Sequence, residues 1–456
     1  FRPDARTAVV IGQGSGVTTH FLLGSPHIRH VTTVEIEPDI IRASRHFYPA
    51  NRRAFDDPRS EFVIDDARSF FASRHRRYDI ITSEPSNPWV SGTADLFTTE
   101  FYHRIRQYLT DGGVFVQWLQ LYEMSDDLVL DVLAAVHQAF PDYRAYMIAN
   151  ADMLIVAGNG PLRAPDWSIV RFPSIATDLA PLPAFTPDLL ESLRLFDRSV
   201  MAPLLDGRRR VNSDYDPIVD LGADRARFLD IGAAGIAGLV DHRFDMVRAL
   251  EGRRRGFGPY TLPPVGDLPA MLNRARSNWI HAAMRDRPVT APPVNSGRGW
   301  ADYAGLAGAL PRLGPPADWD AWTDVLATAA AAVQSGTAGV PDTLFWNAIT
   351  RYVDRENAPP LVRDAVDFLY GAAAWDFQRV RRVAPDLVAA VEAGRATLDP
   401  GEIMDVACVA YLKAGAPDRA LDTLRRLAPL TGRQPGDVRT LLLKAYALKL
   451  RRTASR

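Results

Sequence analysis

A glycine-rich turn between an apolar run and a helix-forming run constrains this chain most. Ala8 to Ile11 is predicted as a buried strand, Gly12-Gln13-Gly14-Ser15-Gly16 follows it, and Glu35 ends the next apolar run. Glycines let the backbone approach a ligand, and an acid about twenty residues further on accepts hydrogen bonds from ribose hydroxyls. The spacing predicts a nucleotide-type site, and by itself leaves open a dinucleotide or a sulfonium nucleoside such as S-adenosylmethionine.

Strand-like and helix-like runs alternate over the first third of the chain. This alternation predicts an α/β, Rossmann-like domain with a mostly parallel sheet covered by helices on both faces. Two further strands, near 143–149 and 153–157, lie close enough in the chain to pair, so we expect antiparallel pairing at the end of the sheet. The predicted parallel strands are Ala8–Ile11, Val31–Ile36, Phe62–Ile64, Tyr78–Ile81 and Val114–Leu119.

Polar residues follow the third and fourth predicted strands, at the edge where open α/β sheets bind ligands. Asp65 and Asp66 follow the third strand. We interpret Asp65 as the N-cap of the next helix, which leaves Asp66 to accept a hydrogen bond from an adenine amine. The fourth strand leads into Ser83-Glu-Pro-Ser-Asn-Pro-Trp89, a loop stiffened by two prolines. Loops at this edge carry function, so Glu84, Asn87 and Trp89 are candidate site residues.

Several motifs together resemble the spermidine synthase (polyamine aminopropyltransferase) family of class I S-adenosylmethionine-type transferases. The resemblance covers about the first third of the chain. The sequence around Glu84 is similar to that of a divergent branch often fused to membrane domains. Asn212-Ser-Asp-Tyr-Asp-Pro217 resembles a further motif of that branch. The remaining motifs are Gly12 to Gly16, Val34-Glu-Ile-Glu37, Phe55-Asp-Asp-Pro-Arg59, Asp65-Asp-Ala67, Tyr78 to Glu84, Leu96-Phe-Thr-Thr-Glu-Phe-Tyr102 and Asp111-Gly-Gly113.

The resemblance implies a class I methyltransferase-like fold that moves an aminopropyl group from decarboxylated S-adenosylmethionine to an amine. It implies Glu84 and Asn87 as catalytic residues and Trp89 and Gln117 as substrate-binding residues, with no metal. The implied residues for the nucleotide co-substrate are Gly12, Gln13, Gly14, Ser15, Gly16, Glu35 and Asp66.

The sequence departs from the family pattern in three places. Ser15 stands where the family usually has an aspartate in the glycine turn. Glu84 and Asn87 stand where the family has two aspartates after the fourth strand. The sequence also shows no counterpart of the β-hairpin domain that closes over the diamine in the family. Two alternatives therefore stay open: an S-adenosylmethionine-dependent methyltransferase of unknown acceptor, and a catalytically weak scaffold whose helical part recruits a protein.

The remainder of the chain is predicted to be mainly helical. We expect a catalytic domain over 1–160, then a connecting region over 161–286 that packs on the catalytic domain and has helical pieces near Pro187–Leu195 and Met271–Met284. A Pro/Gly/Ser-rich linker over 287–299 and a helical domain over 300–456 are expected to follow. Asp399 to Leu450 shows a helix–turn–helix pattern that is tetratricopeptide-like, with a generic helical bundle as the alternative.

Composition restricts the partners and the compartment. The 53 Lys and Arg balance 54 Asp and Glu, so the charge gives no support for nucleic-acid binding. A single cysteine, Cys408, favours a reducing, cytoplasmic compartment. The histidines show no metal-ligand spacing.

No apolar run is long enough to span a membrane, and a tether upstream of Phe1 is left open. The family suggests a small-molecule amine acceptor and a homodimer, and the helical domain suggests a protein partner.

Overall fold

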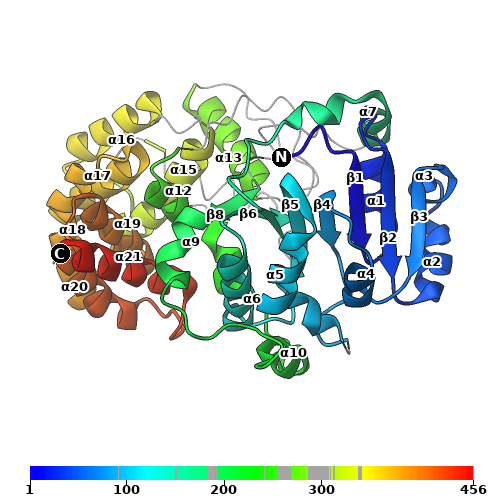
Figure 1. Ribbon diagram of the computed structural model, residues 1–456. Helices are drawn as coiled ribbons and strands as arrows, with labels where there is room; N and C mark the ends of the chain where they lie inside the picture. Colours follow the sequence, from blue (N-terminus) through cyan, green and yellow to red (C-terminus); the bar gives the residue numbers. More distant parts are fainter. Residues whose placement is uncertain are drawn as a thin grey trace. The chain divides into compact units, whose positions relative to one another are not determined.

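The computed structural model describes residues 1–90, 92–148, 152–181, 191, 193–240, 243–254, 269–285, 308, 310–311, 314–336 and 341–454. The described chain divides into two compact units, Phe1–Ala237 and Gly238–Arg456 (Figure 1). The predicted linker over 287–299 lies outside the described residues. No helix among the described residues is both long and apolar enough to cross a membrane.

The first unit is built on one sheet of eight strands in the order β3-β2-β1-β4-β5-β7-β6-β8 (Figure 1). The first five strands of this order are parallel, whereas β7 runs antiparallel to β5, and β6 antiparallel to β7 and β8. The prediction of a mostly parallel, class I methyltransferase-like sheet with antiparallel pairing at its end is confirmed. The strands are β1 Thr7–Ile11, β2 His30–Glu35, β3 Ser60–Ile64, β4 Tyr78–Ser83, β5 Leu109–Gln120, β6 Asp142–Ile148, β7 Asp152–Gly158 and β8 Arg194–Asp197.

Helices cover both faces of this sheet because its central strands are apolar on both sides. On one face, Leu23 of α1 packs in a cluster with Val10 of β1 and Ile80 of β4. On the other face, Phe115 of β5 contacts Phe101 of α5 and stacks on Phe140 after α6. The α-helices of this unit are α1 Val17–Leu23, α2 Pro38–Ser44, α3 Arg52–Asp56, α4 Ala67–Ser73, α5 Thr99–Gln107, α6 Asp126–Ala139, α7 Pro173–Leu179, α9 Arg198–Leu205, α10 Ile218–Phe228 and α11 Ala234–Ala237. Three short 3₁₀ helices are η1 Arg45–Phe47, η2 Thr93–Phe97 and η3 Trp167–Arg171.

The second unit is helical over its described residues. Its consecutive helices pack in chain order, α17 on α18, α18 on α19, α19 on α20 and α20 on α21. The helix–turn–helix expected after Asp399 corresponds to α19, α20 and α21, while the tetratricopeptide-like assignment stays a prediction. The elements are η4 Gly238–Val240, α12 Met246–Glu251, α13 Pro269–Met284, α15 Trp319–Gly336, α16 Thr343–Arg355, α17 Pro360–Ala374, α18 Phe377–Glu392, α19 Pro400–Lys413, α20 Pro417–Leu427, η5 Ala428–Leu430 and α21 Val438–Ala454.

Two observations bear on the middle of the chain. The helix expected near Pro187–Leu195 lies partly outside the described residues, and its end is wrong, because Arg194–Asp197 forms strand β8 against β6. Helices α13 and α15 flank the predicted linker and pack against each other. Both therefore belong to the second compact unit, and the domain bounds predicted from the sequence stay a prediction.

Candidate active site at the carboxyl edge of the sheet

The glycine turn and the end of β4 meet at the point where the strand order reverses. The chain leaves β1 toward β2 on one side and returns to β4 on the other, and ligands of open α/β sheets bind at such a point. Glu84 donates its backbone N–H to the Ile11 oxygen at 2.9 Å. Gly12 has φ +89°, and a Cβ at this position would overlap the Glu84 carbonyl oxygen. Only glycine lets the turn pass so close to Glu84.

Glu35 is bound to the same turn from the end of β2. It is 8% exposed, and its Oε2 accepts the backbone N–H of Gln13 at 2.8 Å while its Oε1 accepts that of Glu37 at 3.0 Å. Each carboxylate oxygen can accept a second hydrogen bond. The structure therefore brings Glu35 and the glycine turn together, with acceptor capacity left for hydroxyl groups.

The remaining turn residues have different surroundings. The Gln13 side chain points inward and donates to Ser44 Oγ at 3.1 Å, so it holds α2 in place. Gly14 is exposed, and the Ser15 carbonyl accepts from Asn51 Nδ2 at 2.7 Å. Asn51 is fully buried and was missed by the sequence analysis, because a single amide next to a short helix gives no motif.

The interpretation of the two aspartates after β3 is wrong in one respect. Asp66, not Asp65, is the N-cap of α4, and its Oδ1 accepts the Ser69 N–H at 2.9 Å. The cap uses one oxygen of the carboxylate, and Asp66 still follows β3 at the same edge as Glu35. The proposed contact from Asp66 to a ligand would therefore use its second oxygen.

Glu84 is a largely buried carboxylate with a hydroxyl partner. Thr18, in the first turn of α1, donates from Oγ1 to Glu84 Oε2 at 2.9 Å. Burial raises the pKa of Glu84 above its ordinary value, and the hydrogen bond from Thr18 opposes this only in part. Within the described residues no cation contacts this carboxylate. Pairing with an arginine, which would give Glu84 a purely structural role, is not observed there.

The loop after Glu84 contacts a second aromatic residue from the segment that follows β5. Asn87 hydrogen-bonds with the hydroxyl of Tyr122, whose pKa is raised mainly by burial. Trp89 meets Tyr122 edge to face, with ring centroids 6.5 Å apart, and the Arg227 guanidinium lies 5.2 Å from the Trp89 ring centroid. Tyr122 was not predicted, since an aromatic residue after a strand gives no signal of its partner.

Gln117 is the one predicted residue that the structure does not bring to this group. It is fully buried in β5, and its Nε2 donates to the backbone oxygens of Ser83 and Trp118 at 3.3 and 2.9 Å. Its Oε1 accepts from Tyr102 at 3.4 Å. The amide is thus satisfied within the protein, on the face of the sheet that α5 covers.

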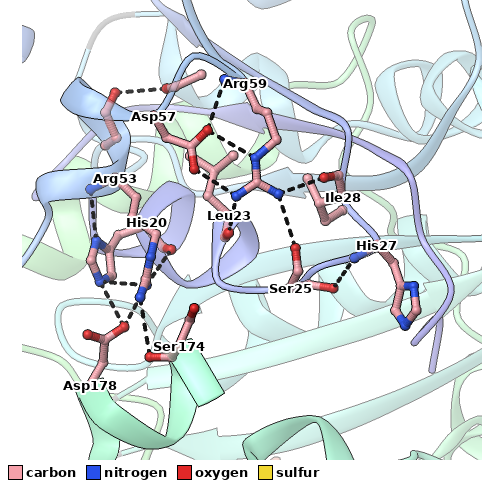
Figure 2. A network of polar contacts seen from close by, with 12 residues as sticks. His20, Leu23, Ser25, His27, Ile28, Arg53, Asp57, Arg59, Ser174 and Asp178 are labelled. Carbon is pink, nitrogen blue, oxygen red and sulfur yellow. Dashed lines mark hydrogen bonds and ion pairs between the residues drawn. The ribbon is translucent and has the colours of Figure 1, made fainter. Parts of the chain in front are cut away.

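Helix α1, which carries Thr18, is held by a polar network at its other end (Figure 2). His20 Nδ1 accepts the Arg53 N–H at 3.1 Å, which places the ring proton on Nε2, facing Asp178 at 3.1 Å. Burial, reinforced by the Arg53 charge, lowers the pKa of His20. Arg59 donates to the carbonyls of Leu23, Ser25 and Ile28 and pairs with Asp57. The network fixes α1, and with it the glycine turn.

The motif from Asn212 to Pro217 organises the helices beside the site. Asn212 is buried, donates to the Phe97 oxygen at 2.9 Å and accepts the Val219 N–H at 3.0 Å. Asp214 forms a two-point ion pair with Arg68 of α4, at 2.6 and 3.0 Å. These contacts tie α4 and η2 to α10 and the segment before it, which is a structural role. Among the described residues no group of three His, Cys, Asp or Glu is arranged to hold a metal ion.

Comparisons with known proteins match the first third of the chain to one family. The family model for the spermine/spermidine synthase domain matches residues 1–153. The polyamine aminopropyltransferase of Desulforudis audaxviator is 31% identical over 144 residues, which are 32% of this chain and 52% of that protein. Polyamine aminopropyltransferase 1 of Pseudomonas aeruginosa is 32% identical over 146 residues, 32% of this chain and 51% of its own. The solved spermidine synthase of Thermotoga maritima aligns with 50% of this chain and 70% of its own at 18% identity, with a TM-score of 0.30.

The strand order and the edge site define a class I methyltransferase-like fold. Within that class, the first third of the chain is spermidine synthase-like. The chain spans about half the length of the relatives that it matches.

Proposed function

We propose that the first unit transfers an aminopropyl group from decarboxylated S-adenosylmethionine to an amine, with Glu84 as the general base. The observation that supports this most directly is the position of Glu84. It is a largely buried carboxylate, with no cation beside it in the described part of the chain, at the strand end where the glycine turn and Glu35 meet. The relatives of the first third of the chain are named polyamine aminopropyltransferases.

The proposed reaction uses Glu84 to remove one proton. The nitrogen of a neutral amine attacks the carbon beside the sulfonium, the carbon–sulfur bond breaks, and methylthioadenosine leaves uncharged. The positive charge moves to the attacking nitrogen, which then gives a proton to the Glu84 carboxylate. A pKa raised by burial makes Glu84 a better proton acceptor, and proton transfer of this kind contributes about 10²–10⁴-fold to a rate.

The nucleotide would be held by groups from three successive strand ends. In this proposal Glu35 accepts from the ribose hydroxyls, Asp66 accepts from the adenine amine, and Gly12, Gln13, Gly14, Ser15 and Gly16 pass beneath the sulfonium end with their backbone. Asn87 would orient the attacking nitrogen, because its amide oxygen can accept a hydrogen bond from the amine. Pro85 and Pro88 stiffen the loop and so hold Asn87 in position. Trp89 would form an apolar wall of the acceptor site.

Calorimetric titration of the full chain tests the proposal. Decarboxylated S-adenosylmethionine, S-adenosylmethionine and methylthioadenosine are compared, followed by mass analysis of an amine incubated with each donor. We expect tight binding of the decarboxylated donor and of methylthioadenosine, and an amine heavier by one aminopropyl group. Methyl transfer from S-adenosylmethionine would replace the proposal by the methyltransferase alternative. Binding of no nucleotide would leave the scaffold alternative.

We further propose that the described helices of the second unit take no part in this chemistry. Glu84, Glu35 and Asp66 all belong to the first unit, as do the residues that contact them. A homodimer and a protein partner of the helical unit stay proposals. Sedimentation velocity of the full chain, with and without methylthioadenosine, tests the dimer.

A further inference from the structure

Gln120, the last residue of β5, is a buried amide without a hydrogen bond. It is fully buried, and neither its Oε1 nor its Nε2 has a partner among the described residues. Buried side-chain polar atoms nearly always have a partner, because an unpaired one destabilises the folded state. Gln120 leaves both ends of its amide in this state, which suggests that a ligand supplies the missing bonds.

A second unpaired polar atom lies directly opposite. Gln120 pairs with Asp152, the first residue of the antiparallel strand β7. Residues directly opposite in such a pair place their side chains on the same face, in contact distance. The Asp152 Oδ1 is also buried without a partner, and the other described contact of its carboxylate is a hydrogen bond from Trp118. Burial raises the pKa of Asp152, the direction for a carboxylate that lacks a cation.

These two residues share a face of the sheet with Glu84. Ser83 of β4 is level with Gln117 of β5, so Glu84 points to the opposite face from Gln117, together with Trp118 and Gln120. The hydrogen bond from Thr18 agrees with this, because α1 covers the same face as Ile80, and Ile80 and Val116 pack against one buried cluster.

The distance between Glu84 and the pair Gln120 and Asp152 suits the two ends of one small molecule. Strand β7 lies two strands away from β4, a lateral distance of roughly 10 Å. A molecule with one nitrogen at Glu84 would therefore direct its other end toward Gln120 and Asp152. A carboxylate oxygen and an amide oxygen are acceptors that suit a primary ammonium, which has three donors.

We propose that Gln120 and Asp152 bind a second, distal amino group of the acceptor, so that this chain prefers diamines to monoamines. The inference rests on the proposed transferase function and adds the acceptor site to it. It also explains why the neutral Asn87 can replace the aspartate of the family in the loop after β4. In this proposal the negative charge that holds the distal ammonium comes from Asp152, at the start of β7.

The test compares two acceptors of equal length, putrescine and butylamine, with decarboxylated S-adenosylmethionine as donor and the full chain as enzyme. The measured quantity is the ratio of kcat/KM for the diamine to kcat/KM for the monoamine. We expect Asp152→Asn and Gln120→Leu each to lower this ratio about 10- to 100-fold, mainly through KM for putrescine. Methylthioadenosine affinity, which depends on the nucleotide contacts, should be unchanged.

Asp224→Asn is the matched control, since it removes one carboxylate from an exposed position on α10. It should leave the ratio as in the wild type. Melting temperatures separate loss of fold from loss of binding, and Gln120→Leu should not lower Tm, because its amide makes no hydrogen bond within the protein. An unchanged ratio in both site variants, with transfer to amines intact, overturns this inference alone. A wild-type chain that transfers to neither amine overturns the proposed function and this inference with it.

Discussion

Two buried carboxylates, Asp405 in the helical unit and Glu84 at the edge of the sheet, have opposite surroundings. In the helical unit, Asp405 is 1% exposed and accepts two hydrogen bonds from Arg433, at 2.8 and 2.7 Å, and one from Arg439 at 2.8 Å. Among the described residues, the partner of Glu84 at the edge of the sheet is a threonine hydroxyl, and that of the Asp152 carboxylate is an indole. A buried charge is stabilised by a fixed counter-charge, and one without it is available to a ligand. The comparison separates carboxylates that maintain the fold from those suited to chemistry.

The largest effect is expected when Glu84, the buried carboxylate without a described counter-charge, is replaced. Glu84→Gln removes the proton acceptor and keeps the volume, so turnover should fall by about 10²–10⁴-fold. Affinity for methylthioadenosine, measured by calorimetry, should barely change, because the ribose and adenine contacts lie elsewhere. Glu61→Gln, near the amino end of β3 and so away from the carboxyl ends of the strands, is the control and should keep its turnover. Full turnover in Glu84→Gln would remove Glu84 from the mechanism.

The second prediction tests the paired carboxylate. Asp405→Asn leaves Arg433 and Arg439 without their counter-charge, so the second unit should lose about 3–5 kcal/mol of unfolding free energy. Urea denaturation followed by circular dichroism measures this loss. Asp418→Asn is the control, since Asp418 is 82% exposed and contacts Arg451 only at 3.9 Å. A loss in Asp405→Asn no larger than in this control would contradict a stabilising role for the cluster.

Glu35 sharpens the comparison, because it is a buried carboxylate held by backbone N–H groups instead of arginine. Glu35→Ala should weaken methylthioadenosine binding by about 1.5–3 kcal/mol, the range for hydrogen bonds to a charged group. Calorimetry measures the change. Glu37→Ala, an exposed N-cap of α2, is the control and should cost little affinity. Equal affinity in Glu35→Ala and wild type would exclude the ribose contact.

The smallest expected effect is on stability against pH. Burial raises the pKa of Glu84 in the folded chain above its value in the unfolded chain. Ionisation of Glu84 therefore costs the folded state stability as pH rises from about 4.5 through the raised pKa. Glu84→Gln should therefore have a higher Tm than wild type at neutral pH, and an equal Tm below about pH 4, where the Glu84 carboxyl group is protonated in both states. A Tm difference that does not vary with pH would contradict the desolvation argument.

The nucleotide side of the site could be predicted from the sequence because its residues are local to recognisable turns. Gly12, Glu35 and Glu84 each follow an apolar run, and the carboxyl ends of parallel strands meet at one edge. Spacing along the chain was therefore enough to bring them together. Asp65 and Asp66 both fit the sequence pattern of a helix cap, and only the structure distinguishes them, because the Asp66 side chain accepts the Ser69 N–H.

The acceptor side was decided by tertiary structure. Gln120 and Asp152 become neighbours through the register of β5 on β7, and β8 forms because Arg194–Asp197 meets the open edge of β6. The sequence determined the strand–helix alternation, the glycine turn and the acids at the strand ends. Which face each side chain occupies, and which buried polar atoms stay unpaired, followed only from pairing between distant segments. A shift of register by one residue moves every side chain to the other face, and a single strand's sequence does not encode its partner's register.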